Sequence, residues 1–279
     1  MVRNVRYSLA VSQERLGDGA PVPLQGGILP AMERAAALGY DSVELHIRDP
    51  RSLDAERIAQ TAERLGITVS AIATGLEYSL NGLTMTSPDP AVRHSMRARY
   101  REHIDLAARL RAVVFLGMCR GNASAFTDIP ALIDLFADEI APIAQYAREQ
   151  SVTLALEPIA FYLTRLLNTT KETLGFLQRP GMQDIGLLLD THHMFIEDPD
   201  IAEAFVSCRG RIAHVHISDS NRRYPGAGSV DFAAVGRALI DIGYDRAVSL
   251  EALPWPDGET AARRGLAWMR GIWGDQPAR

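Results

Sequence analysis

The sequence has little cysteine and no long apolar run. Cys119 and Cys208 are its two cysteines among 279 residues, too few for a disulfide framework. No apolar run approaches the ~20 residues that a membrane-spanning helix needs. The first twenty residues also lack the apolar stretch typical of a signal peptide. We therefore expect a protein of the reducing cytoplasm with no membrane partner.

Blocks of lysine and arginine are also absent, and the formal net charge is −5. The closest approach to such a block runs from Arg93 to Arg111, where arginines are spaced along a predicted helix with apolar residues between them. A solvated helix face explains this pattern. A nucleic-acid partner would need a concentrated basic surface, so we expect none.

No glycine-rich dinucleotide fingerprint follows the first predicted strand. Short apolar runs instead alternate with longer amphipathic segments. The eight predicted strands are Val5–Val11, Asp41–Ile47, Ile67–Thr74, Ala112–Met118, Val152–Leu156, Ile185–Leu189, Ile212–Ile217 and Ala247–Leu250. Apolar strands of this kind are covered on both faces and pair in parallel. An open doubly wound sheet is the alternative, but eight near-equal units favour one (β/α)8 barrel domain spanning residues 1–279.

Amphipathic segments between the strands predict about eight helices. They are Gly27–Leu38, Ser52–Leu65, Ala91–Leu110, Pro130–Gln150, a helix from Thr169 or Thr170 to Gln178, Pro199–Arg209, Asp231–Ile242 and Glu259–Trp273. Ser52 is the expected N-cap of the second helix, and Gly66 follows its end. Residues Gly75–Pro90 are expected to form a loop, because the run Ser-Pro-Asp-Pro breaks regular structure.

Acidic residues and a histidine mark the ends of four consecutive predicted strands. These residues are Glu157 in LALEP, Asp190 in GLLLDTHHM, His216 in HVHIS and Glu251 in VSLEAL. In a barrel these strand ends meet at one mouth, where active sites lie. Three carboxylates crowded there would repel one another, and some would be forced to hold protons. A divalent cation removes this conflict, and three carboxylates with one imidazole suit Mn²⁺ or Mg²⁺.

Each of these residues also has a purely structural interpretation. A glutamate at a strand end can form a salt bridge, and Asp190 can cap the helix that follows it. His214 and His216 alternate along one strand, so either could be a hydrogen-bonded core histidine. Four such residues at the ends of four consecutive strands favour a functional site over four separate coincidences.

These same motifs resemble those of the xylose isomerase-like barrel superfamily. The resemblance lies in ALEP, LLDTHHM, HVHISDSNRRYPGAG and SLEAL, supported by GYDSVELHI, TMTSPDPAVR and IDLAARL in the first half of the chain. Within the superfamily, the chain is most similar to the sugar epimerase and isomerase branch, which includes D-tagatose 3-epimerase, D-allulose 3-epimerase and hydroxypyruvate isomerase. The resemblance covers most of the chain.

The resemblance implies a role for each matching residue. Glu157, Asp190, His216 and Glu251 would bind one divalent metal ion, with Mn²⁺ expected and Mg²⁺ or Co²⁺ as alternatives. Glu157 and Glu251 would also be the catalytic acid–base pair. His193 and Arg222 would contact a substrate oxygen. Relatives of this kind also imply a homodimer or homotetramer.

The segment GMCRGNASAF after the fourth predicted strand departs from the family pattern. It contains Arg120, which we assign as a candidate substrate-binding residue. Its guanidinium could meet a phosphate or carboxylate of the substrate, or instead pair with a neighbouring acid. The segment belongs to a region that contacts substrate in the family, so the identity of the sugar stays open.

The resemblance predicts an isomerase or epimerase acting on a sugar or sugar phosphate. The reaction would remove a proton next to a carbonyl, with the metal stabilising the enediolate. A lyase or dehydratase acting on a keto-sugar or inosose could use the same site. A non-catalytic sugar-binding barrel would need no glutamate pair. Cleavage of DNA at abasic sites would require a trinuclear zinc cluster and a basic face, which the composition does not favour.

Overall fold

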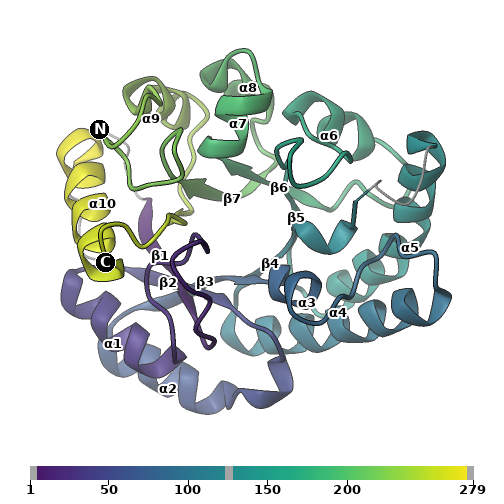
Figure 1. The fold of residues 1–279 in the computed structure, drawn as a ribbon, viewed down its shortest axis with the longest axis horizontal. Coiled ribbons are helices and arrows are strands. Elements are labelled where there is room, and N and C mark those ends of the chain that lie inside the picture. Colours follow the sequence, from purple (N-terminus) through teal and green to yellow (C-terminus); the bar gives the residue numbers. More distant parts are fainter. Residues whose placement is uncertain (1–4, 123–127, 275–279) are drawn as a thin grey trace.

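The computed structural model describes residues 5–122 and 128–274, and its centre is a closed barrel of eight parallel strands (Figure 1). Each strand pairs with its sequence neighbours, and β1 pairs with β8 to close the ring. The strands are β1 (Arg6–Ser12), β2 (Ser42–His46), β3 (Thr68–Ala73), β4 (Val113–Leu116), β5 (Leu154–Leu156), β6 (Gly186–Asp190), β7 (Ile212–Ile217) and β8 (Ala247–Leu250). This confirms the predicted (β/α)8 barrel.

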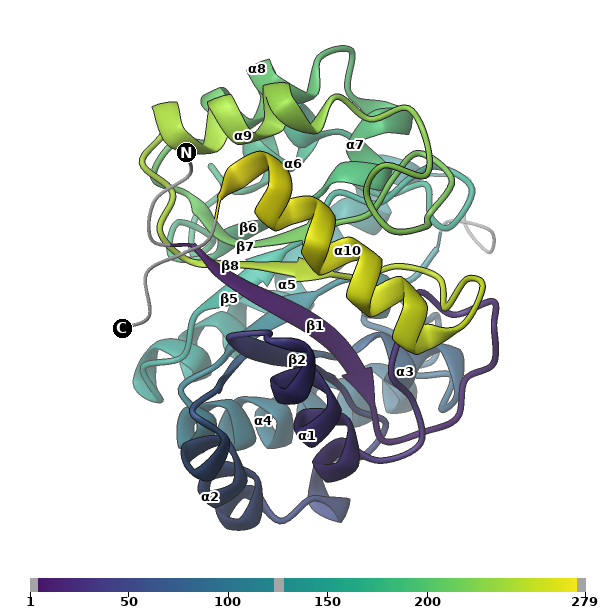
Figure 2. The ribbon, with the colours of Figure 1, turned by 90° about the vertical axis from the view of Figure 1, so that its left-hand side faces the viewer.

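Helices form a ring outside the strands (Figure 1). They are α1 (Ile28–Leu38), α2 (Ala55–Leu65), α3 (Gly75–Ser79), α4 (Pro90–Leu110), α5 (Ile129–Glu149), α6 (Thr170–Phe176), α7 (Thr191–Glu197), α8 (Ile201–Ser207), α9 (Phe232–Asp241) and α10 (Gly258–Trp273). Two short 3₁₀ helices are η1 (Pro50–Ser52) and η2 (Met118–Arg120). Helix α10 packs against β8 between α1 and α9 (Figure 2). No helix in residues 5–122 and 128–274 combines the length and apolarity needed to cross a bilayer.

Three local predictions were wrong or incomplete. Ser52 does not cap α2, because it ends η1, and the Asp54 side chain accepts the hydrogen bond from Arg57 N instead. The expected loop after β3 begins with the five-residue helix α3. Helix α7 follows Asp190 directly, in agreement with the capping interpretation of Asp190, but its bounds were not predicted.

The side chains buried between the strands and the helices differ from those buried inside the barrel. Large aliphatic and aromatic side chains fill the layer between strands and helices. Inside the barrel, the small apolar cluster contains Ala71, Ala73, Ala155 and Ala213 together with Phe115 and Leu188. Bulky branched residues usually fill this space in such barrels. The alanines leave room here for buried polar side chains.

Candidate metal centre and active site

The four predicted ligand residues lie together at the carboxyl ends of β5 to β8. Asp190 ends β6, His216 lies in β7, and Glu157 and Glu251 directly follow β5 and β8. Register places Asp190 opposite His216 across the β6–β7 pair. The hydrogen bond from Glu157 N to Leu116 O, 3.2 Å long, ties the Glu157 backbone to β4.

The ligand atoms of these four residues lie within 4.8 Å of one another, and all four residues are buried. His216 Nδ1 faces Glu251 Oε2 at 3.2 Å, Asp190 Oδ2 at 3.6 Å and Glu157 Oε1 at 3.7 Å. Among the described residues, this buried nitrogen has no hydrogen-bond partner. A buried, unpartnered nitrogen facing three carboxylate oxygens fits a divalent cation, since metal binding satisfies the nitrogen and neutralises the acids.

The two carboxylate oxygens of Asp190 have different roles. Oδ1 accepts a 2.8 Å hydrogen bond from His192 N and so caps α7, whereas Oδ2 faces His216. The capping interpretation and the ligand interpretation are therefore compatible. The cap fixes the side-chain rotamer that directs the second oxygen into the cluster.

Gly117 provides space for Glu157. A Cβ atom at position 117 would lie 2.9 Å from Glu157 Oε2, closer than ordinary van der Waals contact. Glycine at the end of β4 therefore allows the Glu157 carboxylate to approach the neighbouring strand and reach the cluster.

The pKa values of the buried carboxyl groups Glu157 and Asp190 are shifted in opposite directions. Burial raises the pKa of Glu157, and the nearby acids Glu251 and Asp190 add to this rise against the opposing effect of His216. Burial would also raise the pKa of Asp190, but the Arg222 guanidinium together with His193 and His216 outweighs it and holds that pKa well below its usual range. Burial alone would lower the pKa of His216, yet Glu44 and Glu251 raise it well above the usual value. The carboxylates therefore compete for positive charge within the cluster.

Arg222 lies directly against the cluster. Its guanidinium donates to Asp190 Oδ2 and Glu251 Oε2, and also to Ser218 Oγ at 3.0 Å. The residue has a left-handed backbone with φ of 61°. Its amide donates to Asp219 O and its carbonyl accepts from Leu253 N, both at 2.8 Å. These bonds hold the guanidinium between the β6 and β8 acids.

His193 is also beside the cluster. Its Nε2 lies 3.9 Å from Glu157 Oε1, and its buried Nδ1 has no hydrogen-bond partner among the described residues. Burial, together with Arg222, lowers the pKa of His193 to about 3 against the effect of Asp190. The ring is therefore neutral near pH 7 and can donate a hydrogen bond from one nitrogen.

Arg120 occupies a different environment from the one we predicted. It is 1% exposed, and its guanidinium donates to backbone carbonyls. The acceptors are Leu116, Gly117, Glu157, Leu166 and Leu167. These contacts join the ends of β4 and β5 to the following loop. They do not support the predicted contact with substrate or an acidic side chain, because the donors are directed to carbonyl oxygens within the protein. Residues 123–126 of the same segment lie outside the described residues.

Sequence reasoning missed Glu44 and His46 of β2. Glu44 is fully buried, and its carboxylate meets three histidines: His214 Nε2 at 2.6 Å, His46 Nε2 at 2.8 Å and His216 Nε2 at 2.9 Å. His46 Nε2 also lies 3.7 Å from Glu251 Oε1. The alternation of Glu44 and His46 in ELH was the available signal, because alternate residues of a barrel strand share the inner face.

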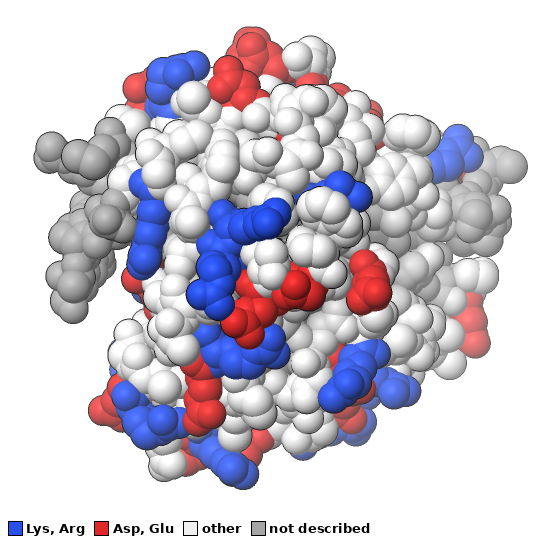
Figure 3. All heavy atoms as spheres, turned by 60° about the vertical axis from the view of Figure 1, so that its left-hand side comes forward, with Lys and Arg blue, Asp and Glu red and all other residues white. Residues whose placement is uncertain are grey.

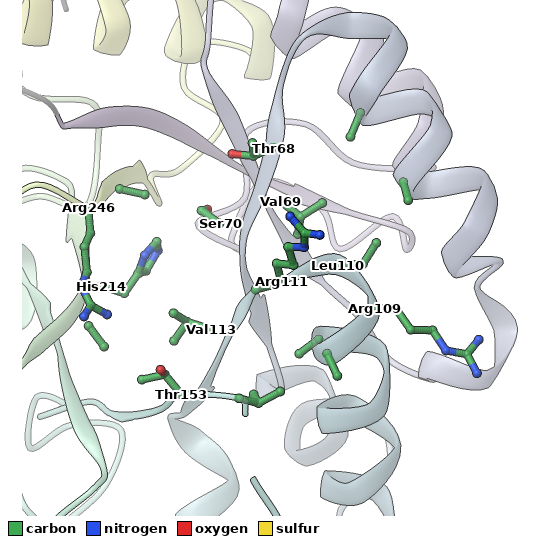
Figure 4. Close-up of a pocket in the computed structure, with 18 of the residues that line it drawn as sticks. Thr68, Val69, Ser70, Arg109, Leu110, Arg111, Val113, Thr153, His214 and Arg246 are labelled. Atoms are coloured by element: carbon green, nitrogen blue, oxygen red, sulfur yellow. The ribbon is translucent and has the colours of Figure 1, made fainter. Parts of the chain in front are cut away.

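A cavity of about 1040 Å³ opens at the opposite end of the barrel (Figure 4). It is lined by residues at strand beginnings, including Arg6, Thr68, Val113 and Arg246. The ligand residues lie at the strand ends, so this cavity is separate from the candidate site. Figure 3 shows acidic and basic side chains interspersed on one face of the molecule, without a broad field of one sign there.

Comparisons with known proteins agree with this geometry. Residues 32–272 match the family described as "Xylose isomerase-like TIM barrel". A ketose 3-epimerase of Arthrobacter globiformis is 30% identical over 250 residues, which cover 88% of this chain and 83% of the relative. An L-ribulose 3-epimerase of Mesorhizobium japonicum is 30% identical over 242 residues, covering 86% and 80% respectively.

A solved structure of an L-ribulose 3-epimerase is also similar. It superposes with a TM-score of 0.82 at 26% identity and covers 96% of this chain and 94% of the other. The similarity therefore includes nearly the whole barrel and the four strand ends that carry the acidic cluster.

Proposed function

Because the chain belongs to the xylose isomerase-like TIM barrel family, we propose that it is a metal-dependent ketose 3-epimerase. The observation that carries this proposal is the buried cluster of Glu157, Asp190, His216 and Glu251. Relatives named ketose 3-epimerase and L-ribulose 3-epimerase support the choice of a ketose as substrate. The reaction is an isomerisation that inverts one carbon next to the ketone.

We assign proton transfer to the two glutamates. Glu157 follows β5 and Glu251 follows β8, so they flank the β6 and β7 ligands around the barrel mouth. One carboxylate removes the proton from the carbon beside the carbonyl, and the other returns a proton on the opposite face. Burial raises the pKa of Glu157 in the cation-free protein.

His193 and Arg222 complete the proposed site. Negative charge develops on the substrate oxygen as the proton leaves, and hydrogen-bond donors at that position stabilise it. The neutral His193 ring and the Arg222 guanidinium are adjacent donors of different charge. When bound, a divalent cation supplies further electrostatic stabilisation of the same developing charge.

Mn²⁺ is the proposed ion, and Mg²⁺ or Co²⁺ could occupy the same oxygen and nitrogen ligands. We further propose a cytoplasmic homodimer or homotetramer. Light scattering after size-exclusion chromatography measures the assembly, and cell fractionation measures the location.

The direct test is to incubate metal-stripped and Mn²⁺-loaded protein with D-fructose, D-tagatose and L-ribulose and separate the products by chromatography. We expect a C3 epimer of at least one sugar in the loaded sample and no conversion in the stripped one. An unsaturated or cleaved product would indicate a lyase or dehydratase instead. Tight sugar binding by stripped protein without turnover in the loaded one would indicate a sugar-binding barrel.

A further inference from the structure

Glu44 is a buried carboxylate outside the four-residue ligand set, and it contacts one member of that set directly. It is fully buried on β2. Oε2 lies 2.9 Å from His216 Nε2 and 2.6 Å from His214 Nε2, while Oε1 lies 2.8 Å from His46 Nε2. Burying an acid is costly unless strong hydrogen bonds compensate for lost water. Three imidazole contacts to one carboxylate provide that compensation.

The arrangement determines which nitrogen of each ring carries hydrogen. An ionised carboxylate only accepts hydrogen bonds, and a neutral imidazole has one donor and one acceptor nitrogen. Three nitrogens around one carboxylate are therefore satisfied when each ring is protonated at Nε2. In a neutral His216 this leaves the lone pair on Nδ1, the atom that faces Glu251, Asp190 and Glu157 and that a bound cation would occupy in place of a proton.

We infer that Glu44 is a positioning residue that fixes the Nε2–H tautomer and ring orientation of His216, and so prepares His216 Nδ1 to bind the cation. This inference rests on the proposed metal-dependent function. Partners of ligating histidines commonly act in this way, and their loss typically weakens metal affinity by 10–100-fold.

Glu44 also connects to the acid–base pair. His46 Nε2 lies between Glu44 Oε1 at 2.8 Å and Glu251 Oε1 at 3.7 Å. The rings of His46 and Phe115 form a T-shaped pair, and so do the rings of Phe115 and His216. Two of the three rings that contact Glu44 therefore reach the proposed site. His46 lies beside Glu251, and His216 faces all three ligand carboxylates.

His214 provides a matched control. It shares Glu44 Oε2 with His216, but it lies toward the cavity at the strand beginnings and belongs to no group that includes Glu157, Asp190 or Glu251. Its ring packs edge-on against His216 at 5.3 Å between centroids. His214→Gln thus perturbs Glu44 and the packing around His216, and keeps the His216–Glu44 contact.

The test measures Mn²⁺ dissociation constants of the full chain by electron paramagnetic resonance of free Mn²⁺. We expect Glu44→Gln to weaken binding by about 10–100-fold and His214→Gln to change it by less than about threefold. Equal affinity in Glu44→Gln and wild type overturns the inference. Equal losses in both variants also overturn it, because general packing damage then explains the result.

A second measurement needs no variant, so it decides the matter even where Glu44→Gln fails to fold. Long-range ¹H–¹⁵N spectra of ¹⁵N-histidine-labelled, Mg²⁺-loaded wild type report which His216 nitrogen bears hydrogen. We expect Nε2–H, and Nδ1–H would refute the inference. Wild type that binds Mn²⁺ but turns over no ketose removes the proposed function alone. Wild type that binds no Mn²⁺ removes both.

Discussion

Replacing Gly117 with alanine would test how closely the Glu157 carboxylate must be placed. The new Cβ would lie 2.9 Å from Glu157 Oε2, where ordinary contact begins at 3.4 Å. The carboxylate would therefore have to move by about half an ångström. Because it is the end of a flexible side chain, we expect the fold to persist while the site changes.

The size of the effect follows from this displacement. A misplacement of ~1 Å in an active site can cost about 10²-fold in rate, so half of that predicts a roughly tenfold loss of kcat, or about 1.4 kcal/mol in the barrier. Chromatographic assays of ketose epimerisation at saturating Mn²⁺ would measure it.

Gly75→Ala is the matched control for this substitution. Gly75 lies two residues beyond the end of β3, near the same end of the barrel as Gly117, and a Cβ at position 75 would meet nothing within 4 Å. We expect its kcat to stay within twofold of wild type. If Gly117→Ala were as active as this control, the argument that Glu157 requires a glycine beside it would be refuted.

Three other perturbations address the same site. Glu157→Gln and Glu251→Gln should each lower kcat by about 10²–10⁴-fold through loss of proton transfer, and near wild-type turnover in either variant would remove that residue from the acid–base pair. Chelation by EDTA should lower the melting temperature and Mn²⁺ should restore it, since free ion at 100 times its Kd adds about 2.7 kcal/mol of stability; an unchanged melting temperature argues against a resident cation. The pKa of His193 is depressed to about 3 in the fold. Below about pH 6.5 the unfolded chain therefore binds a proton at His193 that the folded protein does not bind, so the free energy of unfolding falls as the pH falls towards 3. Urea denaturation between pH 6.5 and 5 measures how the free energy of unfolding changes with pH, and we expect that slope to be smaller in His193→Gln by about one bound proton. Equal slopes in the variant and the wild type would contradict the neutral buried ring.

The sequence predicted the site best where an acidic residue or a histidine lies at the end of a strand. Regular alternation of elements predicted the closed barrel, and convergence of strand ends predicted the grouping of Glu157, Asp190, His216 and Glu251 that the structure shows. Helix α3 was missed because five residues are too few to show a helical period.

Burial was harder to predict than grouping. Arg120 was recognised as a charge near the site, but its direction toward backbone carbonyls depends on where Leu166 and Leu167 lie in space. Glu44 was overlooked because it lies within its strand rather than at the end, although its alternation with His46 indicated that both side chains share one face. The alanines at positions 71, 73, 155 and 213 create the space for it, and that space depends on the packing of several strands.

Charge balance explains how this interior can hold so many acids. Glu44, Glu157, Asp190 and Glu251 are all buried, and isolated buried charges are costly. A dication together with the Arg222 guanidinium would offset all but one of these four negative charges. A single proton on either Glu157 or Glu251 would neutralise the remainder, and moving it between the two would leave the total charge unchanged. Epimerisation requires this same freedom, because one glutamate must gain a proton as the other gives one up.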